Sequence, residues 1–386
     1  MPNNALFKLG FLSRYPPMHC GVGEYTRHLL SALLSIEHGI GAYVFTSTLN
    51  GSDPWEDSIL GIRAIPVFHE KDRDYSRLLD ILAELNGVDI LHVEHEYGIF
   101  GKSLKLVEVL EEARHEKLVR GIAITMHTVL HPSSLREDIE FQKYLNSFDA
   151  IIVHSILQEF ELQWQGVDPR KIYRIPHGTL INPYLEYPRK VLANSLGIDY
   201  EMLRGAIIVI PGFIRRDKGF DILFKALGYV RDKNFTLIVA GETRDASAKK
   251  LIEEASNKHN ILLIEKYLSN DELLRVIGLA DILVLPYRDK TGTYSVSGIL
   301  HLSMGSLKPI VGSRVPRLVE LYQYAPRFTF PPGNTVQLGK MIKWVIENYD
   351  YAVPYMSSLY SYAARTQWIR MARRHLELYL RILGRG

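Results

Sequence analysis

Short apolar runs alternate with helical patterns along the whole chain, and no other feature of the sequence restricts the fold as strongly. In the first half, apolar runs predict strands at residues 7–12, 42–47, 90–93, 122–126 and 150–154. Between them, apolar residues at three- and four-residue spacing predict helices at residues 24–35, 75–86, 104–113 and 156–165. Strands that alternate with helices through short links form parallel sheets covered by helices. The sequence therefore predicts an α/β fold.

A second series of the same kind follows a proline-bearing break at residues 182–188. Its apolar runs predict strands at residues 207–210, 236–240, 261–264, 282–285 and 309–311. A chain of 386 residues also exceeds what one hydrophobic core usually supports. We therefore expect two doubly wound, Rossmann-like domains facing a central cleft, with residues 1–185 in the first and 186–367 in the second.

The last predicted helix, at residues 368–386, has an apolar stripe with arginines around it. We expect this helix to pack back on the first domain. A basic amphipathic helix can also lie on an anionic membrane, and the sequence leaves that alternative open.

The composition excludes several classes of protein. Apolar residues make up 47% of the chain, and the net charge of +3 without runs of like charge gives no sign of a nucleic-acid partner. The single cysteine, Cys20, excludes an internal disulfide and a cysteine-rich zinc site. Neither a signal peptide nor an apolar stretch long enough to span a bilayer is recognisable. We expect a cytoplasmic protein, with peripheral contact at the inner face of the membrane as an alternative.

A loop bracketed by glycines at residues 212–219 carries two cations, Arg215 and Lys218. It follows the predicted strand at residues 207–210, and ligands of open α/β sheets bind at the carboxyl ends of strands. The planar guanidinium of arginine and the compact ammonium of lysine both bind phosphate groups. The loop, which begins at Gly212, therefore predicts a site for a phosphorylated ligand. The alternative is that its cations are only solvated.

A second segment, Ser297, Gly298 and Ile299, opens a helix predicted at residues 298–306. We expect Ser297 to cap this helix and the amides of Gly298 and Ile299 to remain free for a phosphate. Together with the two cations of the first loop, these amides would form a diphosphate clamp. Ordinary helix capping is the alternative.

Gly21 and Gly23 follow the first predicted strand and open a helix, so their backbone can approach an anionic ligand. A dinucleotide fingerprint would place another glycine at position 26, where the residue is Thr26, so NAD binding is disfavoured. A simple tight turn is the other interpretation.

Polar side chains follow two predicted strands of the first domain. His127 ends the strand at residues 122–126, where an imidazole can bind a sugar hydroxyl or have a structural role only. Glu94, Glu96 and Tyr97 follow the strand at residues 90–93, with histidines among them. These histidines suggest a metal at first, but no second ligand cluster completes the coordination sphere. A polar sugar-binding rim is therefore the favoured interpretation.

Taken together, these segments resemble a GT-B fold glycosyltransferase of family GT4, and the resemblance covers nearly the whole chain. The matching motifs are Gly21-Val-Gly23, Thr125-x-His127, Ile175-Pro-His-Gly178 and Gly212-Phe-Ile-Arg-x-x-Lys-Gly219. The segment Glu96-Tyr-Gly-Ile-Phe-Gly101 is similar to a microbial subgroup of the family. Each motif is common by itself, but the set in this order is specific.

The chain departs from the family at the usual pair of glutamates, whose positions hold Tyr294 and Leu302. The second glutamate of the pair ordinarily holds the nucleotide ribose, and a subgroup of the family does without the pair. The resemblance then implies nucleotide contacts at the backbone of Tyr267-Leu268 or at Gly241-Glu242, which follow their own strands.

The resemblance implies a retaining, metal-independent glycosyltransferase that needs no cofactor. It implies that the second domain binds a nucleotide-diphosphate sugar, with a mannosyl or glucosyl group to transfer. The first domain would bind the acceptor, which could be a sugar, a glycan or a lipid-linked glycan. Arg215, Lys218 and His127 are implied as the catalytic residues, with His127 positioning the sugar. The sequence leaves the base open among UDP, GDP and ADP. A nucleotide-sugar epimerase, a sugar phosphorylase and a non-catalytic sugar-nucleotide-binding protein are the alternatives.

Overall fold

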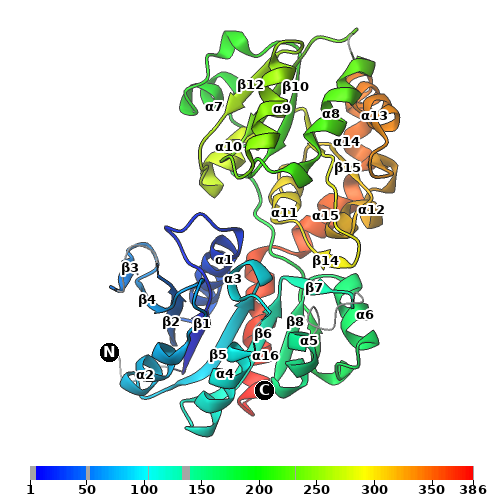
Figure 1. The fold of residues 1–386 in the computed structure, drawn as a ribbon. Helices are drawn as coiled ribbons and strands as arrows, with labels where there is room; N and C mark the ends of the chain where they lie inside the picture. Colours follow the sequence, from blue (N-terminus) through cyan, green and yellow to red (C-terminus); the bar gives the residue numbers. More distant parts are fainter. Residues whose placement is uncertain (1–5, 49–52, 103, 133–139, 231, 386) are drawn as a thin grey trace. The chain divides into compact units, whose positions relative to one another are not determined.

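A computed structural model of the chain describes residues 6–48, 53–102, 104–132, 140–230 and 232–385. The chain divides into two compact units, shown in Figure 1. Unit 1 consists of Met1–Gly178, Thr291–Val296 and Trp368–Gly386, and unit 2 of Thr179–Lys290 and Ser297–Gln367. Each unit thus combines segments that lie far apart in the sequence.

Unit 1 is built on an eight-stranded sheet. Its strands are β1 (Phe7–Leu12), β2 (Ile40–Ser47), β3 (Trp55–Asp57), β4 (Ile62–Phe68), β5 (Val88–His95), β6 (Val119–Met126), β8 (Ala150–Val153) and β9 (Ile172–Arg174). They lie in the order β3-β4-β2-β1-β5-β6-β8-β9, and all neighbours are parallel except β3 and β4. The central strands are buried along most of their length, which is why their sequences are nearly continuous apolar runs.

The helices of unit 1 are α1 (Gly21–Ile36), α2 (Ser76–Glu84), α3 (Tyr97–Phe100), α4 (Lys105–His115), α5 (Glu140–Lys143), α6 (Ile156–Trp164) and α16 (Trp368–Ile382). A capping box formed by Ser155 and Gln158 begins α6. The last helix of the chain, α16 (red in Figure 1), packs against α1. Tyr379 contacts Phe7 of β1, and Ile382 occupies the space beside Gly121 of β6, so α16 also reaches the sheet of unit 1.

Unit 2 is built on a six-stranded, fully parallel sheet. Its strands are β10 (Ala206–Pro211), β11 (Phe235–Ala240), β12 (Ile261–Ile264), β13 (Ile282–Leu285), β15 (Ile310–Ser313) and β16 (Thr329–Phe330). They lie in the order β12-β11-β10-β13-β15-β16. Its helices are α7 (Arg189–Ser195), α8 (Phe220–Leu227), α9 (Ala246–Ser256), α10 (Asn270–Leu279), α11 (Gly298–Met304), α12 (Val319–Tyr324), α13 (Thr335–Glu347), α14 (Tyr349–Tyr355) and α15 (Ser357–Arg365).

A short antiparallel pair explains why the segment Thr291–Val296 belongs to unit 1. Its strand β14 (Thr293–Ser295) pairs with β7 (Thr128–Leu130), which directly follows β6. In this pair Tyr294 lies opposite Val129. The backbone groups of the segment therefore find their partners in unit 1, although the chain on either side of it belongs to unit 2.

The structure confirms the predicted α/β fold with two parallel sheets, and every predicted strand overlaps an observed one. The sequence analysis missed β4, because Arg63 and Pro66 interrupt its apolar pattern. The ladder between β2 and β4 shifts register at Thr46 and Ser47, opposite Pro66. The other missed strands have only two or three residues, which is too short for a periodic pattern.

Candidate active site

The predicted cation loop follows β10 and is held by two glycines in the left-handed region. Gly212 has a φ of 94° and Gly219 a φ of 74°. A Cβ atom at position 219 would lie 2.0 Å from the carbonyl oxygen of Pro286, so only glycine allows this approach. The loop is thereby fixed against the segment that follows β13, and its one 3₁₀ turn, Arg216–Lys218, brings Lys218 into the interior.

Lys218 is a buried cation with a single hydrogen-bond partner among the described residues. Its side chain is 6% exposed, and Nζ donates to the hydroxyl of Tyr287 over 2.7 Å. Burial, together with the nearby guanidinium groups of Arg317 and Arg215, holds the pKa of Lys218 well below its usual value. A bound anion would relieve this cost, so the arrangement favours a phosphate ligand.

Arg215 lies at the exposed start of the same loop. Its Nε and Nη2 donate to the carboxylate of Asp217 over 3.0 and 2.8 Å. Asp217 also accepts a hydrogen bond of 2.6 Å from Nη1 of Arg317. Burial by itself would raise the pKa of Asp217, but the two arginines outweigh burial and lower it. Asp217 is therefore an ionised bridge between two guanidinium groups.

Tyr287 and Arg317 are site residues that the sequence analysis missed. Tyr287 is fully buried just beyond β13, and its hydroxyl accepts the hydrogen bond from Lys218. The guanidinium of Arg317 lies 4.5 Å from the centre of the tyrosine ring. An aromatic residue directly after a strand, at the same sheet edge as the cation loop, was the signal that could have indicated Tyr287.

The predicted helix cap lies beside the cation loop. Ser297 caps α11 by accepting from the amide of Leu300 over 3.2 Å, which confirms the predicted capping. A Cβ atom at Gly212 would lie 2.9 Å from the Ile299 side chain and 3.7 Å from Nζ of Lys218. The structure thus brings the cation loop together with Ser297, Gly298 and Ile299.

The other predicted nucleotide contacts follow the neighbouring strands of the same sheet. A Cβ atom at Gly241 would lie 2.3 Å from the carbonyl oxygen of Gly212, so these two backbones touch. Glu242 forms an ion pair of 2.8 Å with Arg244. The ring of Tyr267 lies 6.2 Å from that of Phe213, and the adjacent Leu268 is buried. The predicted donor contacts of unit 2 therefore share one edge of its sheet.

In unit 1, His127 forms a buried pair with a carboxylate. Nε2 of His127 donates to Oε2 of Glu94 over 2.8 Å, and Glu94 is fully buried. Burial raises the pKa of Glu94, and His127 and Thr125 oppose that rise. Oε1 of Glu94 has no hydrogen-bond partner among the residues that the structure describes. This position turns Glu94 away from the predicted sugar-binding rim and makes it a support for His127.

A chain of polar contacts continues behind this pair into α16. Nε2 of His92 lies 2.7 Å from the hydroxyl of Thr125, and Nδ1 lies 2.6 Å from the hydroxyl of Tyr379. Burial holds the pKa of His92 well below its usual value, so its ring is neutral. The last helix of the chain is therefore linked to the candidate site of unit 1.

Two other predicted residues lie near His127 on the carboxyl side of β5. Glu96 accepts from the hydroxyl of Thr128 over 2.7 Å, and the hydroxyl of Tyr97 donates to Gln142 over 2.9 Å. Both side chains are partly exposed. They remain at the rim of unit 1, in contrast to Glu94.

The two predicted glycines of the N-terminal loop form the first turn of α1 in unit 1. A Cβ atom at Gly23 would lie 3.3 Å from the carbonyl oxygen of Arg14, whereas one at Gly21 would meet nothing within 4 Å. Two residues further along α1, the ring of Tyr25 meets that of His127 edge to face at 4.8 Å. The glycine turn and His127 are thereby connected.

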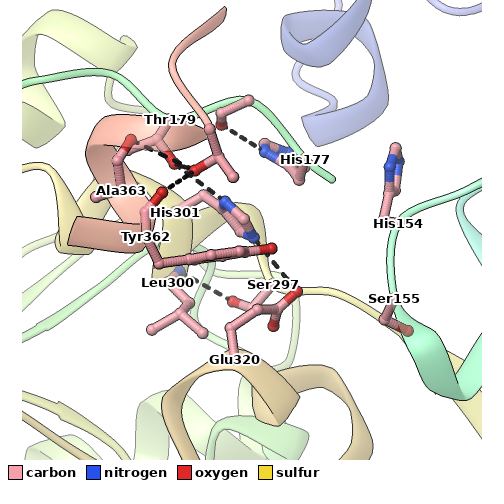
Figure 2. A network of polar contacts seen from close by, with 12 residues as sticks. His154, Ser155, His177, Thr179, Ser297, Leu300, His301, Glu320, Tyr362 and Ala363 are labelled. Carbon is pink, nitrogen blue, oxygen red and sulfur yellow. Dashed lines mark hydrogen bonds and ion pairs between the residues drawn. The ribbon is translucent and has the colours of Figure 1, made fainter. Parts of the chain in front are cut away.

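The residues at the family's glutamate positions belong to different units. Tyr294 lies on β14 and packs against the core of unit 1, whereas Leu302 lies on α11 and packs against the core of unit 2. Beside Leu302 on α11, the polar side chain of His301 is fully buried (Figure 2). Its Nδ1 lies 3.2 Å from the hydroxyl of Thr179, and its Nε2 lies 3.6 Å from the carboxylate of Glu320.

Two negative findings concern only the part of the chain that the structure describes. No group of three or more histidine, cysteine, aspartate or glutamate side chains there is arranged to hold a metal ion. None of its helices has the length and apolar character needed to cross a membrane.

The chain has relatives of known family and fold. Residues 205–348 match the sequence profile of glycosyl transferases group 1. None of the curated protein sequences compared with the chain matches it. A glycosyltransferase structure from Rickettsia africae ESF-5 is 18% identical, with a TM-score of 0.73 over 98% of this chain and 100% of that chain.

Two further solved structures have the same fold over nearly the full length. The Anabaena protein Alr3699/HepE in complex with UDP-glucose is 14% identical, with a TM-score of 0.74 over 96% of this chain and 99% of that one. A UDP-forming α,α-trehalose-phosphate synthase from Burkholderia vietnamiensis is 12% identical, with a TM-score of 0.70 over 98% and 100%.

The two parallel sheets with their helices, shared with these structures over both units, define the GT-B fold. A fold alone does not fix an activity. The match to glycosyl transferases group 1 covers residues 205–348 and indicates that the protein is a glycosyltransferase.

Proposed function

We propose that the protein is a retaining, metal-independent glycosyltransferase that moves a hexose, mannosyl or glucosyl, from a UDP-sugar to a hydroxyl acceptor. The acceptor would be a sugar, a glycan or a lipid-linked glycan. The UDP donor is supported by two proteins of the same fold, Alr3699/HepE in complex with UDP-glucose and the UDP-forming trehalose-phosphate synthase. In this proposal unit 2 binds the donor and unit 1 the acceptor.

The observation that carries the proposal is the buried cation of Lys218 beside the helix cap of α11. When the bond between the hexose and the diphosphate breaks, negative charge develops on the leaving phosphate. Fixed cations in a desolvated site stabilise such charge strongly, because they need no reorganisation during the reaction. Lys218 and Arg215 would do what a divalent metal does in other enzymes.

Arg215 must change partners to take part. Its guanidinium is held by Asp217, whose carboxylate also accepts from Arg317. When Arg215 turns to a phosphate, Arg317 still neutralises Asp217, so no buried carboxylate is left unpaired. The amides of Gly298 and Ile299 would complete the diphosphate contacts.

The nucleotide would bind along the neighbouring strand ends of unit 2. Gly212 and Gly241 let the ligand approach the backbone, because neither carries a side chain at the point where their two segments touch. Glu242 and the Tyr267-Leu268 backbone would contact the ribose and the base. In unit 1, the turn of Gly21 and Gly23 would approach the donor from α1.

His127 would bind a hydroxyl of the transferred hexose. Its Nε2 is taken by Glu94, and among the described residues no side chain or backbone group bonds Nδ1. When Glu94 accepts a hydrogen bond from the N–H at Nε2, Nδ1 is left to accept one from a sugar hydroxyl. Glu96 and Tyr97 would contact the acceptor at the rim.

A donor screen tests this function. The melting temperature is measured with UDP-, GDP- and ADP-sugars, because a ligand that binds only the native protein raises its stability. We expect UDP-sugars to give the largest shift and UDP release to continue in excess EDTA, with the anomeric configuration retained in the product. A strict requirement for magnesium or manganese, or an inverted product, would contradict the proposal.

A further inference from the structure

We propose that Tyr287 is a positioning residue of the donor diphosphate site, because its hydroxyl holds the side-chain nitrogen of Lys218 in the cation loop. The inference rests on the proposed function, since its ligand is the diphosphate of the donor. Tyr287 lies in a segment after β13 that none of the sequence motifs includes.

The hydroxyl of Tyr287 bonds the buried lysine of the candidate diphosphate site. It accepts from Nζ of Lys218 over 2.7 Å. A phenol oxygen can accept a hydrogen bond while it keeps its own proton. Burial raises the pKa of Tyr287 to about 12, and the hydroxyl therefore keeps its proton at neutral pH.

The ring of Tyr287 is fixed, so the position of its hydroxyl is fixed too. The guanidinium of Arg317 lies 4.5 Å from the ring centre, and Arg317 is itself paired with Asp217 and Asp289 over 2.6 and 2.5 Å. The carbonyl oxygen of Tyr287 accepts from the hydroxyl of Ser313 over 2.6 Å. A rigid neighbour of this kind keeps Lys218 Nζ in place before the ligand arrives.

The surroundings of Lys218 make its charge depend on the ligand. Burial and the cations Arg317 and Arg215 disfavour the ammonium form, and the carboxylates of Asp217 and Asp289 favour it. The hydroxyl of Tyr287 is the group that bonds the ammonium directly. A diphosphate adds negative charge, so its binding is expected to draw a proton onto Lys218 when the solution is alkaline enough to have removed it.

The substitution Tyr287→Phe tests the proposal, because it keeps the ring beside Arg317 and removes only the hydroxyl. UDP binding to the full-length protein is measured by calorimetry from pH 6 to 9. We expect about tenfold weaker binding at neutral pH, the usual effect of losing a hydrogen bond to a charged group. We also expect the loss of affinity with rising pH to begin at a lower pH than in the wild type, since Lys218 loses a partner of its charged form.

Tyr360→Phe is the matched control. The hydroxyl of Tyr360 in α15 is also buried in unit 2, but no group in the described part of the chain forms a hydrogen bond with it. This variant should bind UDP as the wild type does, with the same pH profile. An equal weakening in both variants would mean that the hydroxyl of Tyr287 acts only through general stability, and the proposal would be wrong.

Wild-type affinity and an unchanged pH profile in Tyr287→Phe would remove the role of Tyr287 and leave the proposed function standing. Failure of the wild type to bind UDP at any pH would overturn the donor assignment, and the role of Tyr287 with it. If Tyr287→Phe does not fold, Ser313→Ala loosens the same tyrosine by removing the hydrogen bond to its carbonyl oxygen. It should shift the pH profile in the same direction, and an unchanged profile would overturn the proposal.

Discussion

The candidate sites of the two units differ in charge. In unit 2, Arg215, Lys218 and Arg317 gather around the carboxylates of Asp217 and Asp289, so charged groups dominate. At the candidate site of unit 1, the buried carboxylate of Glu94 meets rings and hydroxyls, and the ring of His92 behind it is neutral. A charged cluster suits a charged diphosphate, whereas a neutral chain suits the hydroxyl groups of a sugar. The difference indicates that each unit is adapted to the charge of the part of the substrate that it would bind.

The largest expected effect comes from removing a cation from the candidate diphosphate site of unit 2. Arg215→Ala and Lys218→Ala should each lower kcat by about 10²–10³, the scale of losing one preorganised stabiliser of developing charge. Turnover of a UDP-sugar and the melting temperature are measured together. Arg216→Ala is the control, since Arg216 is an exposed cation in the same turn. Full activity in both site variants, or an equal loss in the control, would contradict the assignment.

Lowering the pH should destabilise unit 1 but not unit 2, and this is the next largest expected effect. Burial lowers the pKa of His95 to about 3 and that of His92 well below its ordinary 6.5. Both rings stay neutral in the folded protein but take up protons in the unfolded chain as the pH falls through 6.5. Stability is therefore present above pH 6.5 and lost below it, by about 1.4 kcal/mol per pH unit for each histidine.

Unit 2 should not lose stability over the same pH range. The lowered pKa of Asp217 makes its contribution disappear only below the ordinary range of an aspartate. Amide hydrogen exchange in β5 and β10, compared at pH 7 and pH 5.5 after correction for the intrinsic rate, reports the two units separately. An equal loss of protection in both strands would show that the buried histidines of unit 1 do not govern its acid sensitivity.

The departure from the family's glutamate pair gives a third test. Leu302 packs against the core of unit 2, so Leu302→Glu should cost about 1–3 kcal/mol of stability and not tighten UDP binding. Val336→Glu, at an exposed position of the same unit, should cost less. The melting temperature without ligand and the Kd for UDP decide the matter. Unchanged melting with several-fold tighter binding would show that position 302 faces the ribose.

The smallest expected effect concerns the pair of Glu94 and His127 in unit 1. Glu94→Gln keeps the shape of the side chain but lets an amide donate to Nε2 of His127, which would move the ring proton to Nδ1. We expect about a tenfold loss of kcat/KM, since the loss of a charge-assisted hydrogen bond is of this order. The melting temperature should not fall, because a desolvated carboxylate is removed.

A double-mutant cycle decides whether Glu94 acts through His127. In a His127→Ala background, Glu94→Gln should have no further effect on kcat/KM. An additive loss would mean that Glu94 contributes independently of His127.

Much of the fold followed from local patterns. The apolar runs gave every central strand, because a strand buried on both faces needs apolar residues at nearly every position. The cation loop could be placed at a sheet edge for the same reason, since Gly212 directly follows such a run. The cap at Ser297 was also predictable, because a capping hydroxyl bonds an amide only three residues away.

Tertiary structure alone decided how the candidate site is supported. Tyr379 reaches His92 across 287 positions of the chain, and Lys218 reaches Tyr287 across 69. Tertiary structure also decided that Glu94 is buried. From its position after an apolar run, the side chain could equally have been exposed at the sugar-binding rim. The sequence by itself determined which residue types end each strand. Which of them meet, and whether each is buried or exposed, depended on how distant segments pack, because desolvation and hydrogen bonding are properties of the assembled neighbourhood.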